Sequence, residues 1–196
     1  MGRARDLANI LSSSGNVALD SELALTLITP TSIDATGGSG SILSSGAVSF
    51  TSASAISLNG VFTSTYTDYL IKCNLTLSGS TTARFRMRLA GTDATGSNYT
   101  TQYLYGNGAT AGAGNTTETI GYLAVVDSSG RTTVDFNLYN PNLAVNTFSN
   151  SKFTTNAMSV GMCGVSHGVA TAYDSITILP GTGTITGSLS IYGYRK

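Results

Sequence analysis

The amino-acid sequence predicts an all-β protein, an antiparallel two-sheet sandwich of the jelly-roll type with a short N-terminal arm. Polar and apolar residues alternate strictly over several segments, as half-buried strands require, because successive side chains point to opposite faces of a sheet. Turn signals rich in small polar residues recur about every 8–12 residues after residue 41, and no helical period appears there. About eight or nine strands of this kind favour a jelly roll, in which doubled Greek keys form two facing sheets.

The composition favours a β-protein that covers part of its surface in an assembly. Charged residues make up only 10% of the 196 residues, against roughly 25% in an average soluble domain, and 23 residues are Gly. Ten basic and ten acidic side chains cancel, so no overall field attracts nucleic acid or an anionic membrane. No run approaches the ~20 apolar residues of a membrane span, and no apolar signal segment opens the chain. We therefore expect no nucleic acid partner and no membrane insertion.

Residues 1–40 are predicted to be a docking arm and linker, and residues 41–196 the sandwich. Near the N-terminus, three apolar residues share one stripe of a short amphipathic helix, and three charged residues lie away from it. So short a helix is marginal alone and needs a partner surface. An extended apolar segment follows, and then DATGGSGS (residues 34–41), which is typical of a linker. The residues expected to dock are Arg3, Arg5, Asp6, Leu7, Ile10 and Leu11.

Residues 68–90 set the pattern for the strands that follow. They are predicted to form two strands folded back on each other as a hairpin, with the small residues 78–82 between them. One face of both strands is apolar, and the other is polar in the first strand and carries three arginines in the second. The residues expected to face the core are Tyr69, Ile71, Cys73, Leu75, Leu77, Ala83, Phe85, Met87 and Leu89.

The other strands are expected at intervals along the body. The predicted ranges are residues 42–50, 55–62, 99–105, 120–126, 132–139, 153–164, 171–179 and 185–194. Residues 127–130 and 180–183 are expected to be turns, and the glycine-rich residues 106–117 a long loop. Val160 and Met162 lie in a strand that is apolar on both faces. A two-layer sandwich covers only one face of such a strand, which predicts a homo-oligomer held by apolar surface.

No pattern in the sequence points to catalysis, so we expect a protein that is not an enzyme and carries no cofactor or metal. The single histidine, His167, lies in a glycine-flanked segment expected to be a loop, without nearby residues at metal-ligand spacing. The carboxylates are scattered singly, and the segment GNGATAGAG lacks the ending of a phosphate-binding loop. Cys73 and Cys163 both fall inside strands, where buried free thiols act as small hydrophobic groups.

Arg84, Arg86 and Arg88 are the one concentrated charge feature. Along one face of a strand they stand about 7 Å apart, because the rise is ~3.3 Å per residue. One interpretation is a solvated sheet face in which they pair with carboxylates such as Asp135 or Glu118. The other is a subunit or partner interface, since Arg favours bidentate contacts with carboxylates. An acidic-glycan or nucleic-acid site is a third reading. The sequence leaves these readings open.

Several segments resemble structural proteins of bacteriophage particles. Residues 2–10, GRARDLANI, resemble the N-terminal signature of short tail-fibre and appendage proteins of tailed phages, especially marine and cyanobacterial ones. The body resembles jelly-roll domains of such virion proteins. That likeness rests on FTSTYTDYLI (residues 62–71), RMRLAGTD (residues 86–93), YNP (residues 139–141) and GTITGSLSIYGY (residues 183–194).

The resemblance implies a virion protein that is assembled in the host cytoplasm. In that family the N-terminus anchors to other virion proteins and the jelly roll forms a homotrimer. The chain has no shaft and no heptad repeat, so the resemblance implies a compact tail-side knob that contacts a glycan of the host surface. Two alternatives stay open at this point, a capsid decoration protein on the head and a carbohydrate-binding module outside viruses.

Overall fold

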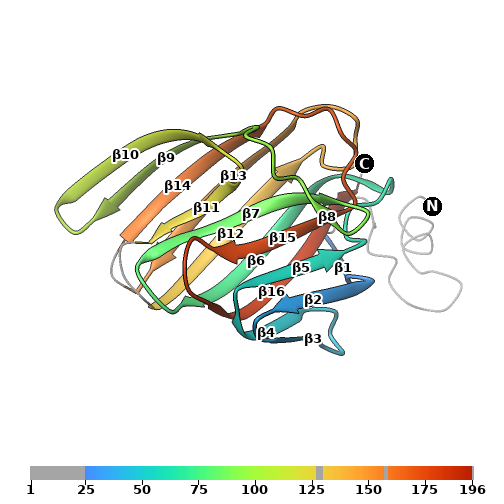
Figure 1. Cartoon of the computed structure of the whole chain (residues 1–196), viewed down its shortest axis with the longest axis horizontal. Helices are drawn as coiled ribbons and strands as arrows, with labels where there is room; N and C mark the ends of the chain where they lie inside the picture. The colour runs from blue at the N-terminus through green and yellow to red at the C-terminus, as the bar shows by residue number, and fades with distance from the viewer. Residues whose placement is uncertain (1–24, 127–129, 157–158, 196) are drawn as a thin grey trace, which may run out of the picture.

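The computed structural model describes residues 25–126, 130–156 and 159–195. These residues form two antiparallel sheets packed face to face (Figure 1). The predicted all-β, jelly-roll-like sandwich is therefore confirmed. The strands are more numerous than the sequence pattern indicated, because the strands predicted at residues 42–50 and 153–164 each contain a turn.

The larger sheet contains ten strands. They are β1 (Thr26–Ile28), β3 (Ser39–Ile42), β4 (Val48–Ala53), β6 (Tyr66–Leu77), β9 (Tyr99–Asn107), β10 (Thr110–Glu118), β12 (Gly130–Tyr139), β13 (Thr147–Thr155), β14 (Ser159–His167) and β16 (Ile185–Arg195). Their order across the sheet is β10-β9-β14-β13-β12-β6-β16-β4-β3, and β1 pairs with β16. The β9–β10 hairpin forms one end of this sheet (Figure 1).

The smaller sheet contains six strands. They are β2 (Ser32–Thr36), β5 (Ala55–Asn59), β7 (Thr81–Leu89), β8 (Thr92–Asp93), β11 (Gly121–Val126) and β15 (Ser175–Pro180). Their order is β11-β7-β15-β5-β2, and β8 pairs with β7. Because this sheet is narrower than its partner, the outer face of the larger sheet is the broadest regular surface of the described fold.

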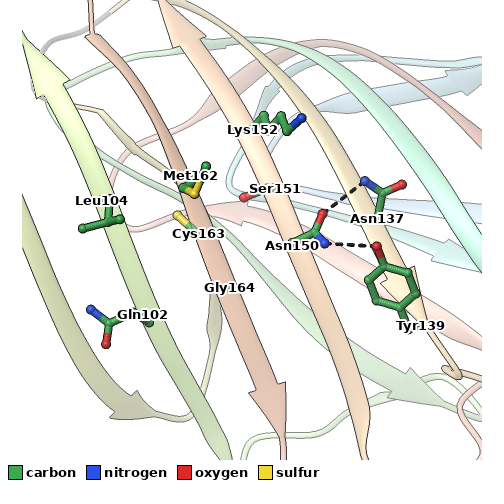
Figure 2. Close-up of a pocket in the computed structure, with 10 residues that line it drawn as sticks. All are labelled: Gln102, Leu104, Asn137, Tyr139, Asn150, Ser151, Lys152, Met162, Cys163 and Gly164. Carbon is green, nitrogen blue, oxygen red and sulfur yellow. Dashed lines mark hydrogen bonds between the residues drawn. The ribbon is translucent and has the colours of Figure 1, made fainter.

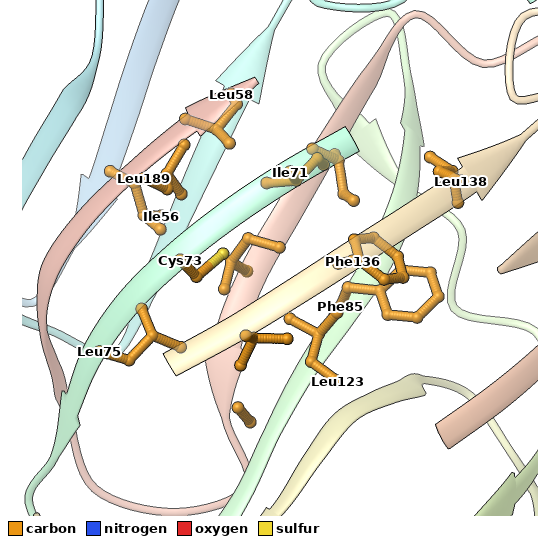
Figure 3. Close-up of a cluster of buried hydrophobic side chains, with 14 of the residues drawn as sticks. Ile56, Leu58, Ile71, Cys73, Leu75, Phe85, Leu123, Phe136, Leu138 and Leu189 are labelled. Carbon is orange, nitrogen blue, oxygen red and sulfur yellow. The ribbon is translucent and has the colours of Figure 1, made fainter. Parts of the chain in front are cut away.

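The core lies between the two sheets and consists of the inward-facing side chains of both. Figure 3 shows Phe85 of β7 beside Phe136 of β12, with ring centroids 4.9 Å apart. The inward faces predicted for residues 68–90 are confirmed, except that Leu89 at the end of β7 is 42% exposed. Cys73 and Cys163 are buried and free, as expected.

The hairpin predicted for residues 68–90 is wrong in its pairing. β6 pairs with β12 and β16, whereas β7 pairs with β11 and β15 in the other sheet. The chain crosses between the sheets after Ser78, whose amide donates to the Thr184 carbonyl at 3.0 Å. β11 and β12, the strands on either side of the turn expected at residues 127–130, do not pair with each other either, because they belong to different sheets. The alternation of polar and apolar residues indicates which face of a strand is buried. It does not indicate whether two consecutive strands pair in one sheet or face each other across the core, because the pattern is the same in both cases.

Residues 106–117 do not form the long loop that their glycines suggested. They complete the β9–β10 hairpin, in which nine residues of β10 pair with β9 without a register shift. Gly112 and Gly114 lie opposite Tyr105 and Tyr103, whose rings occupy the space that side chains on β10 would fill. A Cβ on Gly112 would lie 2.6 Å from Cε1 of Tyr105. Covering a strand glycine with a neighbouring aromatic ring compensates for its missing side chain.

The linker predicted at residues 34–41 is also wrong. These residues belong to β2, which pairs with β5, and to β3, which pairs with β4. Gly37 and Gly38 allow the chain to cross between the sheets in a tight turn. Gly37 has a φ of 69°, which favours glycine, and a Cβ on Gly38 would lie 2.6 Å from the Ala53 amide nitrogen. The sandwich therefore includes residues that we assigned to the arm, and a boundary at residue 40 does not separate two parts.

The strand predicted at residues 153–164 is in fact the end of β13 and most of β14, which pair with each other. Thr155 Oγ1 accepts a hydrogen bond from the Ser159 amide at 3.2 Å, which links the two strand ends. Asn156, which follows β13, is a residue favoured in turns, but one Asn without a neighbouring Gly or Pro is a weak turn signal.

Candidate functional site

Outward-facing side chains of the larger sheet lie in rows, because residues paired in antiparallel strands point to the same face. One row begins at Asn137 on β12, opposite Asn150 on β13. It continues through Gly164 on β14 to Gln102 on β9. We call these four residues the amide row. It crosses four adjacent strands, and its members are brought together by strand pairing rather than by nearness in the sequence.

Hydrogen bonds hold part of the amide row in place. The Asn137 amide donates to Asn150 Oδ1 at 3.2 Å, and the Asn150 amide donates to the Tyr139 hydroxyl at 3.0 Å (Figure 2). At the other end, the Tyr194 hydroxyl donates to Asn137 Oδ1 at 3.2 Å. Both asparagine side chains are thus oriented by hydrogen bonds to their neighbours, and a network of this kind presents polar groups in one arrangement.

A groove of about 580 Å³ lies over the amide row. Figure 2 shows Gln102 on one side of Gly164, and Asn150 with Tyr139 on the other. A Cβ on Gly164 would have no atom within 4 Å, so the space over this glycine is open. Leu104 and Met162, which are paired in register, form an apolar side of the groove. Apolar lining with a few placed polar groups, at this volume, is typical of sites for small ligands.

The charges beside the groove leave one cation without a partner. Lys72 on β6 and Asp135 on β12 form an ion pair at 3.1 Å. Lys152 on β13 lies opposite Asp135 in register and lines the groove. Within the part of the chain that the structure describes, Lys152 makes no ion pair. One carboxylate therefore stands between two ammonium groups, and the edge of the groove is locally positive.

Next to the groove, the sheet face becomes apolar. Leu104, Val160 and Met162 are 52%, 53% and 50% exposed, and we call these three residues the apolar patch. A shallow hollow of about 550 Å³ extends from the patch over Ala111 of β10. The prediction that this strand is apolar on both faces is confirmed, because Val160 and Met162 are exposed whereas Cys163, which follows Met162 in the strand, is buried.

The strand beyond the patch, β10, is an edge strand with no obvious protection against pairing. Natural edge strands are usually short, bulged, or interrupted by Lys or Pro. β10 has nine residues without Lys or Pro, pairs with β9 without a bulge, and has Glu118 at its end as its one charged residue. The patch and this edge together form a surface that another strand or sheet can cover.

Arg84, Arg86 and Arg88 lie on the outer face of the smaller sheet, and each has a carboxylate partner. Arg88 donates to Asp93 at 2.7 Å and approaches Asp34 at 3.9 Å. Arg86 lies 3.9 Å from Asp93. Arg84 lies 3.8 Å from Glu118 and stacks over the ring of Tyr122. These contacts match the paired sheet face, one of the readings that the sequence left open, with Glu118 as one partner.

Asp135, the other partner considered from the sequence, lies on the opposite sheet and pairs with Lys72 instead. The carboxylate of Asp93 also accepts a hydrogen bond from Thr177 at 2.7 Å, which ties β8 to β15. The arginine contacts thus join strands of the smaller sheet to one another and to β10. They explain the three arginines structurally, and their role as an interface with a partner stays a prediction.

The nucleophilic and titratable residues singled out in the sequence are buried. His167 does not lie in a loop but ends β14, where its Nε2 lies 2.6 Å from the Tyr173 hydroxyl and its ring packs on Tyr99. Burial lowers the pKa of His167 below its ordinary value. Burial also raises the pKa of the Cys73 and Cys163 thiols to about 12, so neither forms a thiolate at neutral pH.

The described residues contain neither a metal-binding cluster nor a helix that could span a membrane. No group of three or more His, Cys, Asp or Glu side chains within them could hold a metal ion. No helix within them has the length and apolar character of a membrane span. The predicted docking residues Arg3, Arg5, Asp6, Leu7, Ile10 and Leu11 lie outside the described residues.

Sequence reasoning missed the groove. Its polar side chains lie mostly at outward positions of β9, β12 and β13, and each of these alone is an ordinary solvated side chain. One signal was present in the sequence: Asn137 and Tyr139 occupy alternate positions of one strand, where Ser or Thr is the commoner choice in this chain. The neighbours of that pair on the sheet could not be read from the sequence.

Comparisons with known proteins give similarity to β-sandwich structures at low sequence identity. No protein-family pattern and no curated protein sequence matches the chain. A galectin of Caenorhabditis elegans, LEC-6, is 6% identical over 70% of this chain and 89% of its own length, with a TM-score of 0.33. A GH16 protein of the Bacteroides ovatus mixed linkage glucan PUL, in complex with a G4G4G3G product, is 10% identical over 88% of this chain and 81% of its own, with a TM-score of 0.24.

Proposed function

We propose that this chain is a non-enzymatic structural protein of a tailed-phage particle, a compact tail-side knob assembled from three copies. The single observation that carries the assembly role is the apolar patch beside the open edge of β10. Leu104, Val160 and Met162 are each about half exposed on a surface that is otherwise rich in hydroxyl and amide groups. Apolar side chains gathered in this way mark surfaces that a partner covers.

The location of the patch favours a second copy of the chain as that partner. Charged residues are only 10% of the sequence, so most of the surface offers neither attraction to a charged partner nor repulsion between copies. The β10 edge offers backbone donors and acceptors that a strand of another copy can pair with. Closed cyclic assemblies are the usual form of such contacts, and three-fold symmetry comes from the resemblance to phage appendages.

The resemblance also supports the virion role. Residues 2–10 carry the likeness to an appendage anchor, and β1 is the first strand within the described residues. Residues 1–24 are therefore the segment proposed to bind other virion proteins, through the stripe of Leu7, Ile10 and Leu11. This assignment places docking and self-assembly on different parts of the chain, so they can be tested separately.

Self-assembly is tested by light scattering of the purified chain after gel filtration, at low and high salt. We expect about three times the mass of one chain in both, because an apolar contact does not weaken with salt. Val160→Asp places a charge in the patch and should give a monomer. Thr76→Asp, exposed on the outer face of β6 and three strands away from β14 in the sheet, should not. A wild-type monomer at both salt concentrations contradicts the proposal.

The virion role is tested by locating the protein in phage particles from a culture that encodes it. Density for a three-fold knob on the tail, fitted by this sandwich, supports the proposal. Density on the head lattice supports the capsid-decoration alternative instead. Absence of the chain from purified particles contradicts both.

A further inference from the structure

We propose that the groove over Gly164 binds an acidic saccharide, with a sugar ring over the amide row and its carboxylate beside Lys152. Ligand binding at this groove is a role beyond assembly, although the groove shares Leu104 and Met162 with the apolar patch. It rests on the polar groups left free by the amide row, on the open space at Gly164, on the apolar side of the groove, and on the unpaired charge of Lys152.

The amide row leaves donors and acceptors available to a ligand. Tyr139 accepts from Asn150 and keeps its own hydroxyl hydrogen to donate. Each of the two asparagine amides uses one of its two N–H groups inside the row. Gln102 makes no side-chain hydrogen bond to the rest of the described chain. A ligand rich in hydroxyl groups, which both donate and accept, matches this set, and a purely apolar ligand does not.

The open space over Gly164 sets the width of the proposed site. Gly164 lies between Gln102 and Asn150 in register, so these two amides stand two strand spacings apart, about 10 Å. Nothing fills the space over Gly164, which lets a ring lie close to the backbone. Leu104 and Met162 offer an apolar surface beside it. A pyranose combines an apolar C–H face with hydroxyl groups at its rim, and therefore fits a groove with one apolar side and a row of amides.

The charge selects an acidic sugar over a neutral one. Asp135 is engaged by Lys72 at 3.1 Å, so Lys152 is the group with free charge at the groove. A hydrogen bond between an ammonium and a carboxylate is stronger than one between neutral groups. A nucleic acid strand would meet only this one cation along the groove, whereas stable binding to phosphates needs several.

The test measures binding of a β-1,4-linked mannuronate hexamer and of β-1,4-mannohexaose by calorimetry with the purified full-length chain. These two probes differ in their carboxylates. We expect the mannuronate hexamer to bind about tenfold more tightly than the neutral hexamer at low salt, as one charge-assisted hydrogen bond implies. Lys152→Gln should remove this difference between the two hexamers. Equal binding of both hexamers by the wild type overturns the role of Lys152.

A second variant tests the site itself. Gly164→Val places a side chain in the open space, where a Cβ meets no atom within 4 Å, and valine suits a strand. The fold should therefore persist while binding of both hexamers falls at least tenfold. Ser190→Val, outward on β16, is the matched control and should bind as the wild type does. Binding that survives Gly164→Val overturns the site.

Failure of this inference is distinguishable from failure of the assembly role. If a second copy covers the groove, the wild type should bind neither hexamer, whereas the Val160→Asp monomer should bind the mannuronate hexamer. That result supports the proposal and places the saccharide site inside the contact between copies. If neither the wild type nor that monomer binds either hexamer, the proposal is overturned, whatever mass light scattering gives.

Discussion

Gly114 of β10 lies directly opposite Tyr103 of β9, and the Tyr103 ring occupies the position that a side chain at Gly114 would need. Tyr103 in turn stacks on Tyr122 of the smaller sheet, with ring centroids 6.1 Å apart. The glycine thus allows an aromatic contact between the two sheets at the end of the sandwich.

This relationship predicts that Gly114→Val destabilises the protein. The valine side chain displaces the Tyr103 ring, and overpacking of this kind typically costs about 1–3 kcal/mol of unfolding free energy. Ala113→Val is the matched control, because Ala113 is exposed on the outer face of the same strand. It should change stability little or increase it, since valine favours strands. Urea unfolding of both variants gives the comparison, and equal stabilities would contradict the packing role of Gly114.

Arg88 is predicted to contribute more to stability than a typical surface cation. Its side chain is 14% exposed, donates to Asp93 at 2.7 Å and to Asn59 at 3.1 Å, and so joins β7 to β8 and β5. Arg88→Met should lower the unfolding free energy by about 1.5–3 kcal/mol, the range for hydrogen bonds to charged groups. Lys72→Met removes an ion pair whose side chains are both 53% exposed and should cost less than about 1 kcal/mol. The reverse order of the two losses in urea would show that this network does not stabilise the sheet.

Truncation at the N-terminus is predicted to have two distinct effects. A chain that starts at residue 40 loses β1 and β2, including the partly buried Ile33, and should be insoluble or several kcal/mol less stable. A chain that starts at Leu25 keeps every strand described and should fold and assemble as the full chain does. Under the proposed function it should not join phage particles. Circular dichroism and particle incorporation measure the two effects, and a folded chain from residue 40 would show that β1 and β2 are dispensable.

Stability is predicted to fall as the pH is lowered from neutral, with His167 as one cause. Burial lowers the pKa of His167 in the folded protein below 6.5, its ordinary value. Below pH 6.5 the unfolded chain therefore binds a proton that the folded chain does not, which favours unfolding by up to about 1.4 kcal/mol per pH unit. His167→Gln removes this titration, so the loss of stability between about pH 6.5 and 5.5 should be smaller than in the wild type. Urea unfolding at these pH values gives both slopes, and identical slopes would exclude His167 as the cause.

The class of fold and the buried faces of most strands follow from the alternation of polar and apolar residues alone. Strict alternation placed Tyr69, Ile71, Cys73, Phe85 and Met87 in the core, and the structure buries all five. This prediction succeeds because the side chain of each strand residue points to the opposite face from its neighbour, a property of the backbone that needs no knowledge of partners.

Which strands are neighbours in each sheet follows only from contacts between distant parts of the chain. The candidate site depends on these neighbours, because its residues come from four different strands. Nothing in the alternation of β6 and β7 distinguishes a hairpin from a crossing between sheets, and the glycines of β10 indicate a loop until the rings of Tyr103 and Tyr105 are placed over them. Asn137, Asn150 and Gln102 become one surface only because β12, β13, β14 and β9 lie side by side. Strand pairing is a contact between residues distant in the sequence, whereas periodicity is local, and the groove depends entirely on the former.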